Sequence, residues 1–389
     1  MPTSVLRGAL AAAVALLTFA TPAAADAAAE RVPALVLSEP TGPHPVGTTS
    51  LHLIDESRPD PWVAEKTARE LMVSLWYPAR TAQGRRAPYT TAREAELLLK
   101  ELLIKDLPAD ALSRARTNAF TDAPALGHDR GLPLVVLSPG FSAPRSSLTT
   151  LAEDLASKGY VVAGIDHTYE SAGTAFPDGR ITTCVACRSL DSPGFGKKAT
   201  RGRAADVSFV LDQLLGPDPA WKGARLIDPS RIAMAGHSLG GASSAWTMLT
   251  DARVRAGINL DGGFHIPIPS KGLSRPFLLL GAVKSHKPGG QDPSWGRDWR
   301  RMTGWKRWLT VDGMDHPSFS DFPLIADRIG GGRLPGSRAV EITRTYVGAF
   351  VDLHLRKRPQ PLLEGPSRRY PEVEFWNDSR RSGTVLETA

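Results

Sequence analysis

The sequence predicts an α/β fold with a mostly parallel central sheet that is covered by helices on both faces. Two observations lead to this class. Short apolar runs typical of buried strands alternate with stretches of helical periodicity through residues 134–356, as expected where helices connect parallel strands. One junction between such a strand and the following helix contains the pentapeptide GHSLG at residues 236–240.

The elements are expected in the following order. Apolar runs predict strands at 71–77, 134–138, 161–165, 231–235, 254–260, 276–281 and 308–311. Helical spacing predicts helices at 146–158, 200–215, 241–250, 294–304 and 338–356, and a polar insertion at 91–117 is also expected to be helical. Residues 166–198 are expected to be irregular. Because they begin at the carboxyl end of a strand, we expect them to line the substrate cleft.

Composition divides the chain into three parts. Residues 1–25 resemble a signal peptide, with Arg7, an apolar run and then the AAA tripeptide at 23–25. We therefore expect cleavage after Ala25 and a secreted protein. Residues 26–360 are expected to form a single domain. Residues 361–389 are rich in Arg, Pro and Ser and are expected to form a loosely ordered tail.

The charge pattern narrows the range of partners. The formal net charge is +7, but the basic residues are spread along the chain and do not alternate with aromatic residues, which argues against nucleic-acid binding. No uncharged stretch after residue 25 is long enough to span a bilayer. We expect a soluble monomer that acts on a small ester or lipid substrate.

The GHSLG pentapeptide is the strongest functional signal. In α/β-hydrolases, such a motif between a strand and a helix holds the nucleophilic serine in a strained turn above the sheet. The glycines at positions 236 and 240, two residues before and two after the serine, leave room for that turn. The sequence therefore predicts Ser238 as a nucleophile in an α/β-hydrolase fold. An ordinary structural turn is the alternative.

A serine hydroxyl needs a base to remove its proton. Three histidines follow at a distance, and two have less suitable settings: His286 in a stretch rich in glycine and proline, and His354 near the basic end of the last helix. His316 follows an apolar strand, in the loop where this fold places its histidine. We therefore predict His316 as the base.

An acid is needed to orient that base. Asp261 ends an apolar strand and precedes two glycines, so its carboxylate is expected at the same sheet edge as the serine. Asp292 is the rival, in the loop after the next strand. We predict Asp261, with a turn aspartate as the alternative interpretation.

An oxyanion hole requires two backbone N–H groups that point at the developing negative charge. One is expected from Leu239, directly after the serine. The other is expected from Phe141, which follows a buried strand through Pro139 and Gly140. Together with the serine, histidine and acid, these donors predict ester hydrolysis without a metal ion or cofactor.

These residues resemble those of the type II platelet-activating factor acetylhydrolases and their secreted bacterial relatives. The matching stretches are 41–47, 75–78, 137–141, 151–162, 236–240, 260–262 and 316–322. The resemblance implies that Asp261 rather than Asp292 is the acid, and that His316 is the base. One departure is Pro139, where many members carry histidine, which affects the expected substrate preference.

The resemblance implies short-chain esters as substrates, including the sn-2 acetyl or short acyl group of phospholipids. A broader extracellular lipase or cutinase-like polyester hydrolase is the alternative enzyme. A non-catalytic binding protein on the same fold is the alternative from another class. A peptidase is less well supported, because no peptide-binding strand is evident.

The chain also contains a pair of cysteines and a cluster of tryptophans. Cys184 and Cys187 are expected to form a short-loop disulfide in a secreted chain, whereas a zinc site would need further ligands that are not nearby. Four tryptophans at 295, 299, 305 and 308 lie among basic residues. They predict either a packed helix with solvated charges or transient contact with a lipid surface.

Overall fold

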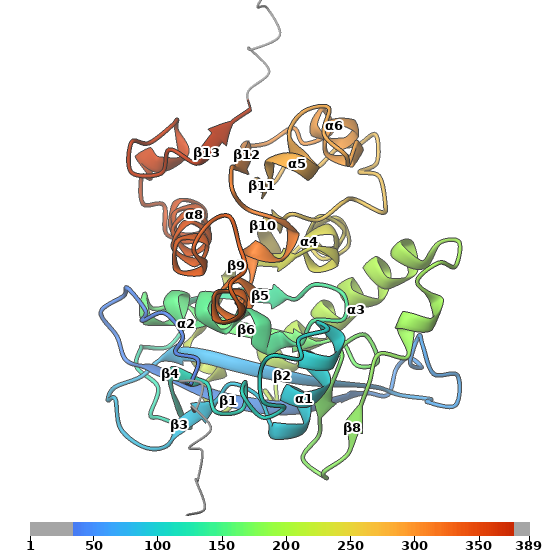
Figure 1. Ribbon diagram of the computed structural model, residues 1–389, viewed down its shortest axis with the longest axis vertical. Coiled ribbons are helices and arrows are strands. Elements are labelled where there is room, and N and C mark those ends of the chain that lie inside the picture. Colours follow the sequence, from blue (N-terminus) through green and yellow to red (C-terminus); the bar gives the residue numbers. More distant parts are fainter. Residues whose placement is uncertain (1–33, 377–389) are drawn as a thin grey trace, which may run out of the picture. The chain divides into compact units, whose positions relative to one another are not determined.

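An eleven-stranded sheet organises residues 34–376, the part of the chain that the computed structural model describes (Figure 1). The strands lie in the order β13-β12-β11-β10-β9-β5-β6-β2-β1-β4-β3. Their bounds are β1 Val46–Asp55, β2 Arg69–Pro78, β3 Arg86–Pro88, β4 Arg116–Thr121, β5 Leu132–Ser138, β6 Val161–Asp166, β9 Ile227–His237, β10 Val254–Leu260, β11 Phe277–Ala282, β12 Lys306–Val311 and β13 Val373–Phe375. A separate hairpin is formed by β7 Thr174–Ala175 and β8 Ile181–Thr182.

The middle of the sheet is parallel. Strands β12, β11, β10, β9, β5 and β6 pair in parallel, whereas β2 pairs antiparallel with β6, and β1 antiparallel with β2. The predicted α/β class with a mostly parallel sheet is therefore confirmed. Because parallel strands all end at the same edge, the residues that follow β5, β9, β10 and β12 are brought to one side of the sheet.

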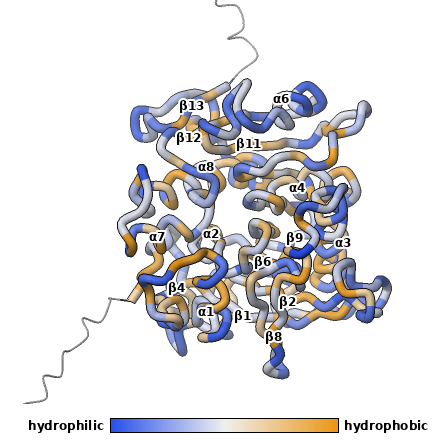
Figure 2. Tube along the Cα trace, turned by 45° about the vertical axis from the view of Figure 1, so that its right-hand side comes forward, coloured by the Kyte–Doolittle hydropathy of each residue, from blue (hydrophilic) through white to orange (hydrophobic). Residues whose placement is uncertain are grey.

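Helices cover both faces of this sheet. Their bounds are α1 Ala92–Glu101, α2 Thr149–Ser157, α3 Phe195–Leu215, α4 Leu239–Thr250, α5 Val283–His286, α6 Ser294–Trp299, α7 Phe322–Ala326 and α8 Gly336–Arg356. Alternate residues of β5 point to opposite faces. Val135 and Leu137 join a buried cluster with α2 and α8, whereas Leu134 and Val136 join another with α3 and α4. In Figure 2, hydrophilic residues gather at α6 and at the tip of the β7–β8 hairpin.

One strand of the structure was not predicted, and two predicted elements differ from it. The strand β1 was not expected, because its sequence alternates with polar residues and several of its side chains are partly exposed. The insertion at 91–117 is helical only over α1, and its end enters β4. The helix predicted at 294–304 ends at Trp299.

The boundary predicted at residue 360 is wrong for residues 361–376. In these residues, β13 pairs antiparallel with β12, through Leu309 opposite Phe375 and Val311 opposite Val373. Both Val373 and Phe375 are buried, so apolar burial holds this segment against the sheet. Residues 377–389 and the signal peptide predicted at 1–25 lie outside the described residues.

Two sequence expectations concern the surface. Cys184 and Cys187 form the predicted disulfide, with 5.3 Å between their Cα atoms. Trp295, Trp299 and Trp308 are buried in the cluster beneath α6. This burial agrees with the packed alternative and removes these three side chains from any lipid contact. Within residues 34–376, no helix has both the length and the apolar character needed to cross a membrane.

Candidate active site

Ser238 lies at a sharp turn between β9 and α4. Its backbone has φ 54° and ψ −121°, a conformation that residues other than glycine adopt only under strain. The turn is possible because glycine stands nearby: a Cβ atom on Gly240 would lie 2.0 Å from the carbonyl oxygen of Ser138. The partly exposed Ser238 hydroxyl therefore stands beyond the edge of the sheet, as predicted from the pentapeptide.

The structure brings His316 and Asp261 to this serine. His316 Nε2 lies 2.9 Å from Ser238 Oγ, and His316 Nδ1 lies 2.7 Å from Asp261 Oδ2. Asp261 follows β10 and is buried, whereas the side chain of His316, after β12, is 51% exposed. The three side chains predicted from the sequence thus form one hydrogen-bonded series.

The carboxylate of Asp261 is held in its charged form. Burial alone would raise its pKa, but hydrogen bonds from His286, His316 and the Ala282 amide outweigh burial and lower it. An ionised Asp261 accepts a hydrogen bond from the Nδ1–H of His316. The Nε2 of neutral His316 is then unprotonated and can accept the serine proton.

Asp261 also contacts a second histidine, His286, whose sequence setting had made it a less suitable candidate for the base. His286 Nδ1 donates to Asp261 Oδ1 over 2.8 Å, and the imidazole ring stacks on Trp295 with 4.0 Å between ring centroids. Burial opposes a charge on His286, but Asp261 and Asp292 outweigh it and raise the pKa of His286 to about 9. His286 is therefore cationic at neutral pH.

Asp292 does not contact His316. Its Oδ2 lies 3.6 Å from His286 Nε2, a distance that makes an ion pair but exceeds a hydrogen bond. Asp292 therefore pairs with the His286 nitrogen opposite the one that contacts Asp261. The choice of Asp261 over Asp292 agrees with this geometry.

The two predicted oxyanion donors are available. Within the described residues, neither the Phe141 amide nor the Leu239 amide donates a hydrogen bond to the protein, as is usual for the first residue of a helix such as Leu239. Gly140 lies beside the serine, because a Cβ atom on it would be 3.5 Å from Ser238 Cβ. The chain before Phe141 therefore passes next to the nucleophile.

His237 positions the loop of the predicted base. Its Nε2 lies 2.7 Å from the backbone oxygen of His316, and burial, together with the neighbouring His316, lowers the pKa of His237 to about 4. A neutral imidazole can donate from only one nitrogen, so the proton lies on Nε2. Although His237 is part of the pentapeptide, no sequence pattern indicated this role.

A second series of the same residue types lies behind Phe141. Ser138 Oγ is 2.8 Å from His167 Nε2, and His167 Nδ1 is 2.7 Å from Asp206 Oδ2. All three residues are at most 1% exposed. Residues 166–198 were expected to line the cleft, and this is wrong for His167 and Glu170, which are buried in this polar network. Their separation in sequence left no pattern by which to find it.

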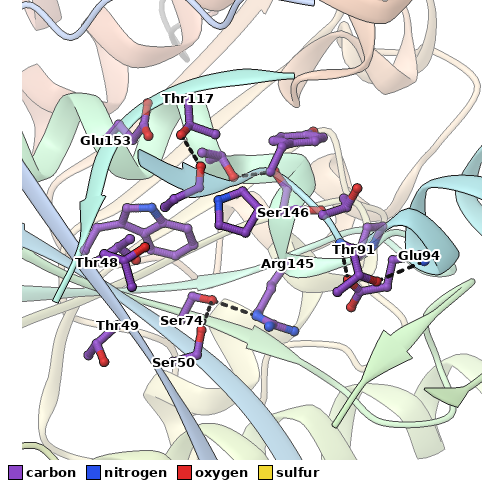
Figure 3. Close-up of a pocket in the computed structure, with 18 of the residues that line it drawn as sticks. Thr48, Thr49, Ser50, Ser74, Thr91, Glu94, Thr117, Arg145, Ser146 and Glu153 are labelled. Carbon is purple, nitrogen blue, oxygen red and sulfur yellow. Dashed lines mark hydrogen bonds between the residues drawn. The ribbon is translucent and has the colours of Figure 1, made fainter. Parts of the chain in front are cut away.

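The pocket drawn in Figure 3 lies elsewhere. Its cavity volume is about 420 Å³, and its lining contains none of the residues 238, 261 and 316. Arg145 crosses its floor and donates to Ser74 over 2.8 Å, and Ser74 lies 3.4 Å from Ser50. The cavity of Figure 3 is therefore not the candidate active site.

The strand order, the turn at Ser238 and the histidine after β12 are those of the α/β-hydrolase class. Comparison with known proteins is more specific. The family model described as platelet-activating factor acetylhydrolase, isoform II, matches residues 32–179 and 218–346. The chain belongs to this family, and it is a carboxylic ester hydrolase.

Individual relatives agree with the family. The chain is 30% identical to a probable 1-alkyl-2-acetylglycerophosphocholine esterase of Arthroderma benhamiae, over 90% of this chain and 96% of the relative. It is 25% identical to a platelet-activating factor acetylhydrolase of Gallus gallus, over 57% of this chain and 62% of the relative. A solved ferulic acid esterase from Streptomyces cinnamoneus is 44% identical, with a TM-score of 0.79, covering 89% of this chain and 100% of that one.

Proposed function

We propose that this protein is a serine esterase in which Ser238 is the nucleophile, His316 the general base and Asp261 the orienting acid. The Ser238 Oγ attacks the ester carbonyl carbon while its proton passes to His316 Nε2. The electron pair of the carbonyl moves to its oxygen, and the amides of Phe141 and Leu239 stabilise this oxyanion. Asp261 remains ionised and stabilises the imidazolium.

The intermediate then collapses to an acyl-enzyme. The imidazolium of His316 gives its proton to the departing alkoxide oxygen, so the leaving group is released as an alcohol. A water molecule next loses a proton to His316 and attacks the acyl carbon. The second collapse returns the proton to Ser238 Oγ and releases the carboxylic acid.

One observation carries this proposal: a single chain of hydrogen bonds, 2.9 Å and 2.7 Å long, joins a strained, partly exposed serine through His316 to a buried carboxylate. A fluorophosphonate probe tests it, because only an activated serine reacts readily. We expect one adduct, located at Ser238 by mass spectrometry. A folded protein that remains unlabelled would favour the non-catalytic alternative.

Within ester hydrolysis, we propose a small acyl group and a phospholipid-like alcohol as the preferred substrate. The family match and the Arthroderma benhamiae relative support this choice. The test is kcat/KM for acetyl, butyryl and octanoyl esters of one alcohol. We expect kcat/KM to fall steeply when the acyl group exceeds a few carbons. A rise in kcat/KM of about tenfold or more from acetyl to octanoyl would support a lipase or polyester hydrolase, because each buried methylene favours binding by roughly 0.8 kcal/mol.

A specific observation favours a second candidate, hydrolysis of aromatic acyl esters. The Phe195 ring at the start of α3 lies 4.9 Å from the ring of Phe141 and 5.4 Å from that of Trp62. All three side chains are partly exposed, and Phe141 is next to Ser238. The ferulic acid esterase is also 44% identical. Adding a feruloyl ester to the same series separates the candidates, because a maximum at feruloyl would replace the short-acyl preference.

We also propose that the protein is secreted after cleavage behind Ala25. The pattern of residues 1–25 supports this, and the Cys184–Cys187 disulfide suits an oxidising compartment. Amino-terminal sequencing of protein collected from the medium of a secreting host is the test. We expect Asp26 as the first residue, and protein retained in the cells with residues 1–25 intact would contradict the proposal.

A further inference from the structure

A buried arginine holds the backbone of the loop that carries the oxyanion donor. Arg203, in α3, donates from Nη1 to the carbonyl oxygen of Pro139 and from Nη2 to that of Gly140, the latter over 3.4 Å. Its side chain is only 1% exposed. Two consecutive carbonyl groups of the loop therefore point toward one guanidinium group.

The second of these carbonyl groups determines where the Phe141 amide points. Gly140 C=O and Phe141 N–H belong to the same peptide plane, and in a trans peptide these groups point in opposite directions. No cis peptide bond occurs among the described residues. The Gly140 oxygen accepts from Arg203 and also, over 3.3 Å, from the Ala143 amide. With this oxygen held on one side, the Phe141 N–H is directed to the other.

From this geometry we propose that Arg203 is a positioning residue that presets the oxyanion hole by fixing the Gly140–Phe141 peptide. The proposal rests on the esterase mechanism above and adds to it a residue that touches neither substrate nor Ser238. A donor that is already oriented needs no reorganisation when the oxyanion forms, and this saving lowers the barrier.

The surroundings of Arg203 fix it firmly enough for this task. Its Nε donates to Glu170 Oε2 over 2.8 Å, and its Nη1 lies 3.3 Å from Ser138 Oγ. Glu170 in turn accepts from Trp62 Nε1 at 2.9 Å, and its backbone oxygen accepts from the Ser142 amide. The loop is thus held on both sides of Phe141. Ser142 itself has φ 61°, a strained value that such contacts maintain.

Arg69 provides a matched control in the same network. It is fully buried like Arg203, and its guanidinium donates to Asp206 over 2.8 Å and 3.1 Å and to Asp60 over 2.6 Å. Its guanidinium donates to the carbonyl group of Thr168 over 2.7 Å and, within the described residues, to no carbonyl group of residues 139–141. Arg69→Lys disturbs the pairs with Asp206 and Asp60, and Arg203→Lys the pair with Glu170. Both variants therefore alter one buried guanidinium of the same network, but only the second releases the loop.

The experiment measures kcat, KM and the inhibition constant of 2,2,2-trifluoroacetophenone for both variants and the unaltered enzyme. Ser238 Oγ adds to the ketone carbon of this probe, the proton passes to His316, and the oxygen becomes an oxyanion like that of the reaction. For Arg203→Lys we expect kcat to fall on the order of 10- to 100-fold, below the loss for deleting an oxyanion donor. The inhibition constant should rise in parallel, with KM nearly unchanged.

For Arg69→Lys we expect a lower melting temperature, with kcat and the inhibition constant within about threefold of the unaltered enzyme. If Arg203→Lys does not fold, Glu170→Gln replaces it, since the neutral amide keeps the contact with Arg203 but loosens it; the same parallel change, several-fold, is then expected. Equal changes in the two arginine variants, or a folded Arg203 variant with unaltered kcat and inhibition constant, would overturn the proposal. An unaltered enzyme without esterase activity would instead overturn the proposed function.

Discussion

The molecule contains two Ser–His–Asp series with nearly equal hydrogen-bond lengths. In one, Ser238, His316 and Asp261 lie at 2.9 Å and 2.7 Å; in the other, Ser138, His167 and Asp206 lie at 2.8 Å and 2.7 Å. Burial lowers the pKa of His167, and Arg69 and His167 help to hold the pKa of Asp206 well below its usual range against its burial. His167 Nε2 therefore accepts a hydrogen bond from the Ser138 hydroxyl, as neutral His316 accepts one from that of Ser238.

The difference lies in what surrounds the two serines. Ser238 has a strained backbone, is partly exposed and has free N–H groups nearby. Ser138 is 0% exposed, and its oxygen receives a hydrogen bond from Arg203. The hydrogen bonds among the three side chains therefore do not distinguish the two series. Exposure, a strained turn and free backbone N–H groups distinguish the proposed reactive series of Ser238 from the buried series of Ser138.

The largest contrast is expected from removing each serine hydroxyl. Ser238→Ala should lower kcat by about 10⁶-fold, as loss of a serine nucleophile does elsewhere, without unfolding the chain. Ser138→Ala should lower kcat by less than about tenfold and keep fluorophosphonate labelling, because its hydroxyl never meets substrate. Initial rates and labelling of both purified variants check this. A labelled Ser238→Ala protein would assign the nucleophile elsewhere.

The next contrast concerns the acid of the reactive series. Asp261→Asn should lower kcat by about 10⁴-fold, because an amide no longer fixes the productive His316 tautomer. Asp292→Asn should cost only about tenfold or less, since Asp292 reaches that carboxylate only through His286. Steady-state rates at one pH compare the two. Equal losses, or a larger loss for Asp292→Asn, would move the role of the acid to Asp292.

For the buried series the effect should be on stability rather than on rate. Asp206 accepts from Arg58, Arg69 and His167, so Asp206→Asn leaves the buried guanidinium of Arg69 incompletely compensated. Breaking such a pair costs about 3–5 kcal/mol. We expect urea unfolding at lower concentration, while the rate of fluorophosphonate labelling per folded molecule changes far less than in Asp261→Asn. An unaltered unfolding midpoint would contradict this role.

The smallest effect is the pH dependence of stability that comes from His286, which lies between Asp261 and Asp292. The pKa of His286 is raised to about 9, above the ordinary value of about 6.5. The folded state therefore binds the extra proton, and the resulting stability is fully present below pH about 6.5 and lost as pH rises through about 9. We expect the free energy of unfolding to fall over that window by on the order of 3 kcal/mol.

His286→Phe should remove this alkaline loss, and His354→Phe serves as the control. The pKa of His354 is lowered to about 4 by burial and nearby cations, so its contribution has the opposite sign and is lost as pH falls. Urea unfolding curves at several pH values measure both. If the His286 variant keeps the alkaline loss of the original protein, the raised pKa belongs to another group.

The sequence was sufficient to predict that Ser238, Asp261 and His316 lie together. Ser238, Asp261 and His316 each follow an apolar strand, and parallel strands deliver their following residues to one edge, so chain order alone brought them together. His286 was set aside because its stretch of glycine and proline looked like surface. It is buried because α5 follows β11 directly and turns the imidazole onto Trp295.

The buried network could not be predicted in this way. Arg203 stands in a helix whose nearby basic residues, Lys197, Lys198 and Arg201, are exposed, so its charge resembled another solvated one. Its partner Glu170 lies 33 residues away, and Asp206 lies 137 residues from Arg69. Pairs at such separations leave no local periodicity.

The strand β13, which is synthesised late, supports the strand that leads to His316. Beyond its pairing with β12, the Asp312 amide donates to the Glu372 oxygen and the Trp376 amide to the Trp308 oxygen, directly before the loop of His316. A growing chain therefore contains Ser238 and Asp261 well before β12, which leads to His316, gains β13 as its neighbour. We expect Ser238 to be unreactive in chains that stop before β13, because the strand before the His316 loop then lacks this support.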